Sequence, residues 1–296
     1  MSTTSNLARL MRLASLAALI TALTLALAKG VAWWLSGSVS LLAGLTDSLL
    51  DGAASLLNLL AVHYALRPAD DDHRYGHGKA EALAGLGQAL FIGASAVLVG
   101  SHAVDRLLNP EPVTASTLGI AVMVLSLLMT VALLTFQRYV VKQTGSTAIR
   151  ADSLHYRSDL LLNSSILVAL LLASFGWPQV DALFAIGIAL YIFWSALTIV
   201  REAAKVLMDQ ELSTEVTAQM QTIACAVPGV IGIHDLRTRL SGTHWFVQMH
   251  VELPGNLPLI QAHDICEQVE KAIVDQYPRA EVLIHADPHS VVKHHP

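Results

Sequence analysis

Two pairs of ionisable side chains interrupt otherwise apolar stretches of this sequence. Asp47 and Asp51 form one pair, and His155 and Asp159 form the other. A spacing of four residues places both members of a pair on one face of a helix, about one turn apart. Charges in hydrocarbon are costly and therefore usually face a partner, an ion or water. If two helices bring the pairs together, three carboxylates and one imidazole form a shell for a divalent metal of the zinc type.

An alternative interpretation treats each pair as the solvated end of a helix. That explanation is adequate for one pair taken alone. Two such pairs, at comparable positions along two apolar segments, favour a pathway for cations across a membrane.

A second cluster of possible metal ligands lies in a polar connection. Asp70, His73 and His77 follow one another at spacings of three and four residues. Those spacings are compatible with three ligands around one ion in a helix or a tight loop. A solvated polar loop would have the same composition, so the sequence alone leaves both interpretations open.

The C-terminal part offers a third set of imidazole and carboxylate groups, which suits one or two zinc ions. Its members are His234, His250, His263, His285 and Asp287. Scattered surface histidines would give a similar set, because spacing cannot show that such distant residues converge. The remaining histidines are interpreted as structural or solvated: His63, His102, His244, His289, His294 and His295.

Composition indicates that these groups belong to a membrane protein. Of the 296 residues, 54% are hydrophobic and 14% are charged, and the mean hydropathy is +0.54. Soluble domains carry about 25% charged residues. A net charge of −5 argues against a nucleic-acid-binding protein, and two cysteines are too few for a thiolate metal cage.

Six apolar runs are each long enough to cross a bilayer as a helix, which needs about 20 residues. They are Leu13–Leu35, Val39–Leu66, Ala80–Leu107, Val113–Val140, Thr147–Phe175 and Val180–Val200. The first run resembles a secretory signal, but its hydrophobicity continues past any plausible cleavage point, so we expect a retained helix. The sequence therefore predicts a multi-pass helical membrane domain over residues 1–207.

Basic residues predict how these helices are oriented. They gather before the first run, in the second and fourth connections and after the sixth run, whereas the opposite connections are nearly bare. Positive residues favour the cytoplasmic side, so both termini are expected there. Lys29 is expected to extend from the end of the first helix toward the interface.

Composition changes after about Met208, and no later run could span a membrane. The pattern predicts a helix over Ser213–Val227, strands over Ile233–Leu240 and His244–Leu253, a helix over Leu257–Gln276 and a strand over Ala280–Ala286. Residues 208–296 are therefore expected to form a cytoplasmic α+β domain with the order α-β-β-α-β.

Together these motifs resemble the cation diffusion facilitator family of metal transporters across nearly the whole chain. The resemblance rests on the two intramembrane pairs, the segment Asp70–Lys79 and the histidine-bearing tail. It implies a homodimer in membrane lipid that exports cytoplasmic divalent metal, Zn²⁺ above all, while protons move inward. It also implies a metallochaperone-like fold for the tail, with Zn²⁺ there as a structural or regulatory ligand.

The resemblance assigns roles to the clusters by position. Asp47, Asp51, His155 and Asp159 become the transport site, and Asp70, His73 and His77 become a loop site. The five tail residues named above become a binuclear site in which Asp287 bridges two ions. The resemblance further implies a salt bridge between Lys79 and Asp209 that links protomers or domains.

Two departures from zinc-selective relatives affect the expected substrate. The first transport ligand is Asp47 rather than histidine, and the connection near Lys142 is short and lacks histidine. One imidazole among three carboxylates is a harder shell, so Cd²⁺ and Fe²⁺ are expected as substrates beside Zn²⁺. The tail has no Cys-x-x-Cys motif, which favours ligation by histidine and aspartate.

Two other function classes fit the sequence less well. A membrane metalloenzyme needs an open metal position for water, and no nucleophile–base or HExxH arrangement occurs in the sequence. A receptor that only senses metal would leave two buried acidic pairs without a purpose. A secondary transporter is therefore expected.

Overall fold

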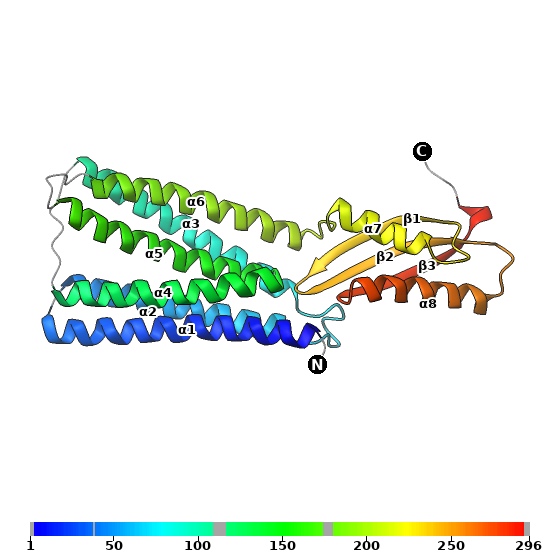
Figure 1. The fold of residues 1–296 in the computed structure, drawn as a ribbon, viewed down its shortest axis with the longest axis horizontal. Coiled ribbons are helices and arrows are strands. Elements are labelled where there is room, and N and C mark those ends of the chain that lie inside the picture. Colours follow the sequence, from blue (N-terminus) through cyan, green and yellow to red (C-terminus); the bar gives the residue numbers. More distant parts are fainter. Residues whose placement is uncertain (1–2, 38, 109–116, 174–179, 293–296) are drawn as a thin grey trace.

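The computed structural model describes residues 3–37, 39–108, 117–173 and 180–292. Figure 1 shows two parts in line: a bundle of long helices and, beyond one end of it, a smaller α+β domain. The first described helix begins at the end of the bundle next to this domain, and the described chain ends in the α+β domain. This arrangement confirms the predicted fold class.

The bundle contains the six predicted helices. They are α1 (Thr3–Ser36), α2 (Val39–Ala65), α3 (Lys79–Leu108), α4 (Thr117–Thr144), α5 (Thr147–Ala173) and α6 (Val180–Leu207). Three predicted boundaries fall short by several residues: α1 begins at Thr3 rather than Leu13, α4 ends at Thr144 rather than Val140, and α6 ends at Leu207 rather than Val200. A helix can continue beyond the hydrocarbon on polar residues, which hydropathy alone does not register. The predicted boundaries at Val113 and Phe175 lie outside the described residues.

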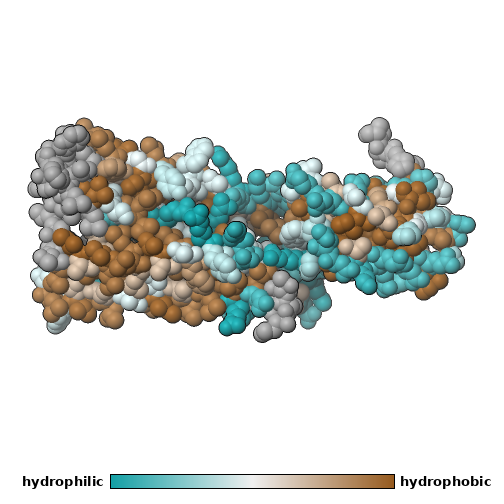
Figure 2. All heavy atoms as spheres, in the orientation of Figure 1, coloured by the Kyte–Doolittle hydropathy of each residue, from teal (hydrophilic) through white to brown (hydrophobic). Residues whose placement is uncertain are grey.

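Large apolar side chains cover the outside of the bundle. Figure 2 shows a hydrophobic surface over the helices and a hydrophilic surface over the junction and much of the other domain. Leu27, Trp34 and Leu128 are exposed, whereas the buried positions are mostly alanine and serine. This distribution is the one expected of helices surrounded by lipid.

Five of the helices meet length and apolarity criteria for a membrane span in the described part of the chain. The sixth, α5, is of similar length, but its first half carries Arg150, Asp152, His155, Arg157 and Asp159. Figure 1 shows α5 running beside the other helices. Helix α5 thus has the length of a membrane helix and carries a cluster of ionisable groups in its first half.

Small residues allow the closest helix pairs to form. The main pairs are α3 with α6 and α1 with α2. A Cβ on Gly93 would lie 3.7 Å from Ala196, and one on Gly100 would lie 3.5 Å from Ala189. Helices in lipid associate through such close packing because apolar burial provides little driving force there.

The tail domain consists of α7 (Thr214–Cys225), β1 (Gly232–Ser241), β2 (His244–Leu253), α8 (Leu259–Gln276) and β3 (Ala280–Pro288). A 3₁₀ turn, His289–Val291, follows. The sheet order is β1-β2-β3, with β1 antiparallel and β3 parallel to β2. Gly242 turns the hairpin with a φ of +59°, which favours glycine.

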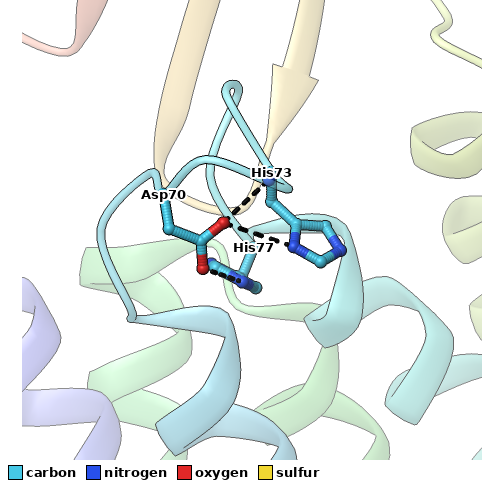
Figure 3. Close-up of side chains that lie close together, drawn as sticks. All are labelled: Asp70, His73 and His77. Atoms are coloured by element: carbon cyan, nitrogen blue, oxygen red, sulfur yellow. Dashed lines mark hydrogen bonds and ion pairs between the residues drawn. The ribbon is translucent and has the colours of Figure 1, made fainter.

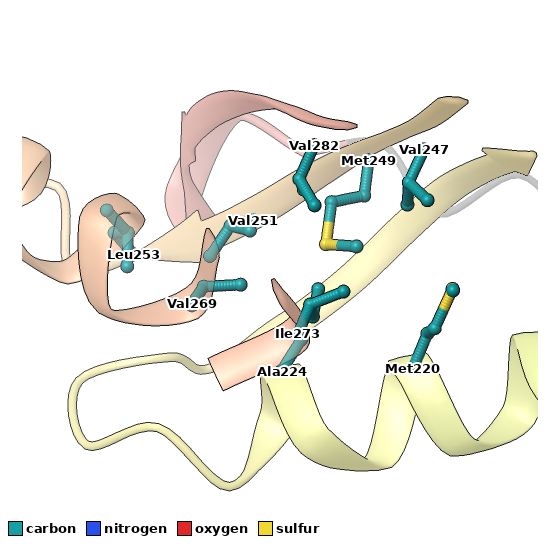
Figure 4. Close-up of a cluster of buried hydrophobic side chains, with 9 residues drawn as sticks. All are labelled: Met220, Ala224, Val247, Met249, Val251, Leu253, Val269, Ile273 and Val282. Carbon is teal, nitrogen blue, oxygen red and sulfur yellow. The ribbon is translucent and has the colours of Figure 1, made fainter. Parts of the chain in front are cut away.

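One face of this sheet forms the core of the tail domain. Val247, Met249 and Val251 alternate along β2 and pack against Val269 and Ile273 of α8, with α7 completing the cluster (Figure 4). Because successive strand residues point to opposite faces, Gln248, His250 and Glu252 point away from the helices. The predicted metal ligands His234, His250 and His285 lie in one row across the three strands.

Candidate metal centres

The transport ligands predicted on α2 and α5 converge inside the bundle. The Nε2 atom of His155 lies 2.8 Å from Oδ1 of Asp51 and 3.8 Å from Oδ2 of Asp159. One ligand atom from each of the three residues lies within 4.8 Å of the others. We call Asp51, His155 and Asp159 the membrane trio. Two carboxylates and an imidazole from two helices make a suitable set for a divalent cation.

Asp47, the fourth predicted ligand, stands apart from the trio. It lies one turn earlier on α2, is exposed, and is absent from the group of converging ligand atoms among the described residues. Its carboxylate is still within electrostatic range of Asp51, His155 and Lys29. The structure therefore brings three of the four predicted residues together.

Tyr156 fixes the helix that carries His155. Its hydroxyl donates to the backbone oxygen of Ala18 at 3.0 Å and lies 2.9 Å from Oγ of Ser55, while only 2% of the residue is exposed. These contacts tie α5 to α1 and α2 beside the trio. Tyr156 was not among the predicted site residues, although its position next to His155 in the sequence is a signal.

Asp152 is a second residue that sequence reasoning missed. It lies one turn before His155 on α5 and is completely buried. Its two carboxylate oxygens accept hydrogen bonds from Gln88 of α3 at 3.1 Å and Gln137 of α4 at 2.6 Å. An acid in a membrane helix is a detectable signal, but only the structure supplies its partners. The carboxylate joins three helices next to the trio.

The predicted loop ligands also lie together (Figure 3). Asp70 places Oδ1 3.5 Å from Nδ1 of His73 and Oδ2 3.3 Å from Nε2 of His77. The three residues, here called the loop cluster, offer ligand atoms within 4.8 Å of one another. The connection is therefore shaped as a possible three-ligand site.

Backbone geometry holds Asp70 as an anion. Backbone N–H groups of His73 and Asp72 donate to its Oδ1 at 2.7 and 3.1 Å. The hydrogen bond from His73, with the nearby imidazoles, holds the pKa of Asp70 below its usual value. His77 is buried, and its Nδ1 has no hydrogen-bond partner among the described residues. A charged carboxylate and buried imidazole suit a metal better than a solvated loop.

The same loop packs on the hairpin of the tail domain. A Cβ on Gly78 would lie 2.6 Å from backbone atoms of Ser241, so the two backbones touch. The ring of Tyr75 lies 5.4 Å from that of Phe246 and 4.5 Å from the guanidinium carbon of Arg239. The loop cluster is therefore attached to both parts of the molecule.

Lys79 and Asp209 form an ion pair at this junction. The Nζ atom of Lys79 lies 2.8 Å from Oδ1 of Asp209, and Nη1 of Arg239 lies 3.6 Å from the same oxygen. The hydrogen bond from Lys79 and the charge of Arg239 lower the pKa of Asp209. Within one chain, the pair joins the start of α3 to the segment after α6.

Three tail histidines form one row across the sheet. His234 of β1 pairs with His250 of β2, and His250 pairs with His285 of β3. The ring centroids are 5.0 Å apart for the first two and 4.7 Å apart for the second two. Strand register alone therefore gathers imidazoles that are far apart in the sequence.

Asp287 lies at the end of this row with one oxygen on each side. Its Oδ2 is 2.7 Å from Nδ1 of His250 and 3.4 Å from Nε2 of His234, and its Oδ1 is 3.1 Å from Nε2 of His285. We call His234, His250 and Asp287, whose ligand atoms converge within 4.8 Å, the tail cluster. Partial burial opposes ionisation, but the hydrogen bond from His250 and the three imidazoles lower the pKa of Asp287.

Glu252 and His289, which are not among the predicted ligands, lie next to the tail cluster. The buried carboxylate of Glu252 contacts Nδ1 of His234 at 3.0 Å and Nδ1 of His289 at 2.7 Å. Because Glu252 holds one ring nitrogen of His234, the other faces Asp287, an arrangement typical of metal-ligating histidines. The sequence places His289 among the structural or solvated histidines, and the structure shows it in contact with Glu252 beside the tail cluster.

His263 is placed differently from the other predicted tail ligands. It lies on α8, is exposed, and contacts Oε1 of Glu267 with its Nε2 at 3.4 Å. It is not part of the converging groups among the described residues. Its role as a ligand stays a prediction.

Comparison with known families matches both parts of the chain. The cation efflux transmembrane domain matches residues 15–208. The cytoplasmic domain of cation efflux proteins matches residues 212–289.

Individual relatives match over almost the entire length. The cation-efflux pump FieF of Klebsiella pneumoniae is 51% identical over 96% of this chain and 95% of its own. The FieF of Citrobacter koseri has the same identity and coverage. A solved structure of CzrB in its zinc form is 27% identical, covers 29% of this chain and 99% of that chain, and has a TM-score of 0.27.

Proposed function

This chain belongs to the cation efflux family, the cation diffusion facilitators, and from that premise we propose that it exchanges cytoplasmic divalent metal for external protons. The family makes it a multi-pass membrane protein for metal cation efflux, a transporter rather than an enzyme. The metal, the counter-ion and the orientation are the parts that we propose.

The convergence of the membrane trio carries this proposal. Asp51 comes from α2 and His155 and Asp159 come from α5, within helices otherwise surrounded by apolar side chains. Ionisable groups in that position usually mark an ion pathway. We propose that Asp47, one turn away on α2, completes the ligand set when metal enters.

The exchange follows from competition for the same lone pairs. A carboxylate or imidazole that binds a proton cannot bind a metal through that lone pair, so loading with metal releases protons. When the trio faces the cytoplasm, its members lose protons and bind the ion. When it faces outward, protons replace the ion, and the protonated, metal-free site returns to the cytoplasmic side, where it releases the protons. No separate proton channel is required.

The donor set favours metals of intermediate softness. Imidazole suits Zn²⁺ and Fe²⁺, while carboxylates shift the preference toward harder ions. We propose Zn²⁺ as a main substrate, with Cd²⁺ and Fe²⁺ also transported, because one histidine is combined with three aspartates.

The loop and tail clusters suit resident zinc rather than cargo. Their donors are imidazoles and ionised carboxylates, and the second nitrogen of His234 is already held by Glu252. Bound zinc would supply a cross-link between strands in the tail and within the loop at the junction. We propose a homodimer in which zinc in the tail regulates or stabilises the assembly, since the tail belongs to the cytoplasmic domain of this family.

The basic residues near the tail-side end of the bundle support the remaining assignments. We propose that residues 1–207 form the transport domain in the bacterial inner membrane. Residues 208–296 and the N-terminus would face the cytoplasm.

Reconstitution tests the exchange directly. Protein in vesicles is supplied with Zn²⁺, Cd²⁺, Fe²⁺ or Mn²⁺, and metal uptake and internal pH are recorded together. We expect uptake with opposite proton movement, lost in Asp51→Ala and retained in Asp105→Asn, a change at an exposed site on α3. Normal zinc flux in folded Asp51→Ala would reject the assignment, and metal flux without proton movement would reject antiport.

A further inference from the structure

Lys29 of α1 lies beside the transport site instead of extending from the helix end. Its Nζ donates a hydrogen bond of 2.7 Å to Oγ of Ser48, the residue that follows Asp47 on α2. Ser48 is 1% exposed, so this contact is inside the bundle. The expectation that Lys29 extends to the interface is therefore wrong for the described conformation.

A glycine on α2 provides room for this side chain. A Cβ on Gly44 would lie 3.6 Å from Cδ, 3.8 Å from Cε and 3.9 Å from Nζ of Lys29. The aliphatic part of Lys29 thus lies across α2, one turn before Ser48. The close pairing of α1 with α2 maintains this direction.

The ammonium group acts on the transport ligands through its charge. Lys29 lies within electrostatic range of Asp47 on α2 and of Asp159 on α5. The charge of the ammonium on α1 therefore interacts with carboxylates on two other helices. A lysine in a membrane helix is costly unless it faces such groups.

Counting charges shows what this cation changes. Metal ligation requires ionised carboxylates. In the metal-binding state Asp47, Asp51 and Asp159 therefore contribute three negative charges, and Lys29 contributes one positive charge. His155 ligates a metal as a neutral imidazole, so the sum is −3 + 1 = −2, which one divalent ion cancels. Without Lys29 a bound divalent ion would leave one uncompensated negative charge in the bundle.

We infer that Lys29 is a fixed counter-charge of the transport site, which matches the site to one divalent cation and weakens binding enough for release. This inference rests on the proposed function. Lys29 would be a specificity-determining residue rather than a metal ligand, since its ammonium has no lone pair to offer. Alternatively, Lys29 could serve only to hold α1 against α2. In that case zinc affinity would depend on the shape of the side chain at position 29 more than on its charge.

The test measures zinc binding to the full-length protein in lipid nanodiscs. Binding to the transport site is defined as the part that Asp51→Asn removes, so the loop and tail sites do not contribute. Lys29→Met is expected to strengthen this binding about tenfold, because a nearby positive charge is lost. In vesicles, the same variant should show a lower KM and a turnover reduced about fivefold.

Matched variants separate charge from packing. Lys29→Arg keeps the charge and should stay within about twofold of the unsubstituted protein, as should Lys142→Met on the exposed end of α4. If Lys29→Met does not fold, Lys29→Gln, which keeps a polar contact to Ser48, replaces it. Unchanged zinc affinity in Lys29→Met, or equal effects of Lys29→Met and Lys29→Arg, would overturn the inference about Lys29. Either result would leave the proposed function untouched. Absence of any Asp51-dependent binding in the unsubstituted protein would reject the proposed function, and the inference with it.

Discussion

The membrane trio and the tail cluster use the same kinds of ligands but position them differently. In the membrane, α5 supplies two ligands one turn apart and α2 supplies the third. In the tail, His234 and His250 come from paired positions on β1 and β2, and Asp287 comes from β3. A small shift of α2 against α5 would open the first site. A comparable shift of strands would break the sheet, because register fixes every side chain at once.

This difference matches two different tasks. A transporter must bind an ion and release it on the other side, so its site has to lie between elements that can move. A regulatory or structural ion is best held by elements that stay together. The junction formed by Tyr75, Gly78 and the Lys79–Asp209 pair connects the two regions.

The largest expected effect comes from Asp159→Asn. It removes a charge from the membrane trio and should reduce zinc transport at least about 100-fold, since the ligand has no substitute at that position. Zinc binding by the tail should remain. Flux assays and zinc titration of the same preparation measure both quantities. Loss of tail binding as well would show that the two regions are not separate sites.

His250→Ala removes a ligand from the tail cluster and leaves the membrane trio intact. His250 is central in the tail row, so zinc binding there should weaken about 100-fold, while proton-coupled flux through the trio persists. Titration calorimetry and zinc-dependent thermal unfolding provide the measurement. The matched control is His244→Ala, an exposed residue at the start of β2. If flux disappears together with tail binding, the tail ion is required for transport and the proposed division of tasks is wrong.

Glu252→Gln should have a smaller effect on the tail. The amide keeps the shape of Glu252 but not its charge, and such changes behind a metal ligand cost about tenfold in affinity. Zinc competition with a chelator of known affinity measures this difference. Affinity equal to that of the unsubstituted protein would remove Glu252 from the tail site.

The smallest effect is expected at Asp209, between the two regions. Its pKa is lowered in the folded protein, so the ion pair with Lys79 stabilises the fold above about pH 4, the ordinary aspartate pKa. That contribution is lost as the pH falls through the lowered pKa. For a partly exposed pair it is at most about 1 kcal/mol.

Thermal unfolding from pH 3 to 7 should therefore show a smaller decrease on acidification for Asp209→Asn than for the unsubstituted protein. Asp264→Asn on α8, far from the junction, is the control. Identical pH profiles for both variants would show that the ion pair contributes nothing to the fold.

The two regions also differ in how far the sequence predicts them. The pairs Asp47–Asp51 and His155–Asp159 were recognisable because a spacing of four is enough to place two residues on one helix face. The histidines of the tail gave no comparable signal, because His250 lies 16 positions after His234 and His285 lies 35 positions after His250. Only the hairpin register and the parallel crossover through α8 put them side by side.

The sequence by itself determined the apolar spans, the order of the tail elements and the helix faces that carry acids, because each depends on neighbours a few residues apart. Packing between distant segments decided the rest. It turned Lys29 toward Ser48, buried Asp152 between Gln88 and Gln137, and placed Glu252 against both His234 and His289. Helix rotation and strand register follow from how whole surfaces fit together, and no local pattern encodes that fit.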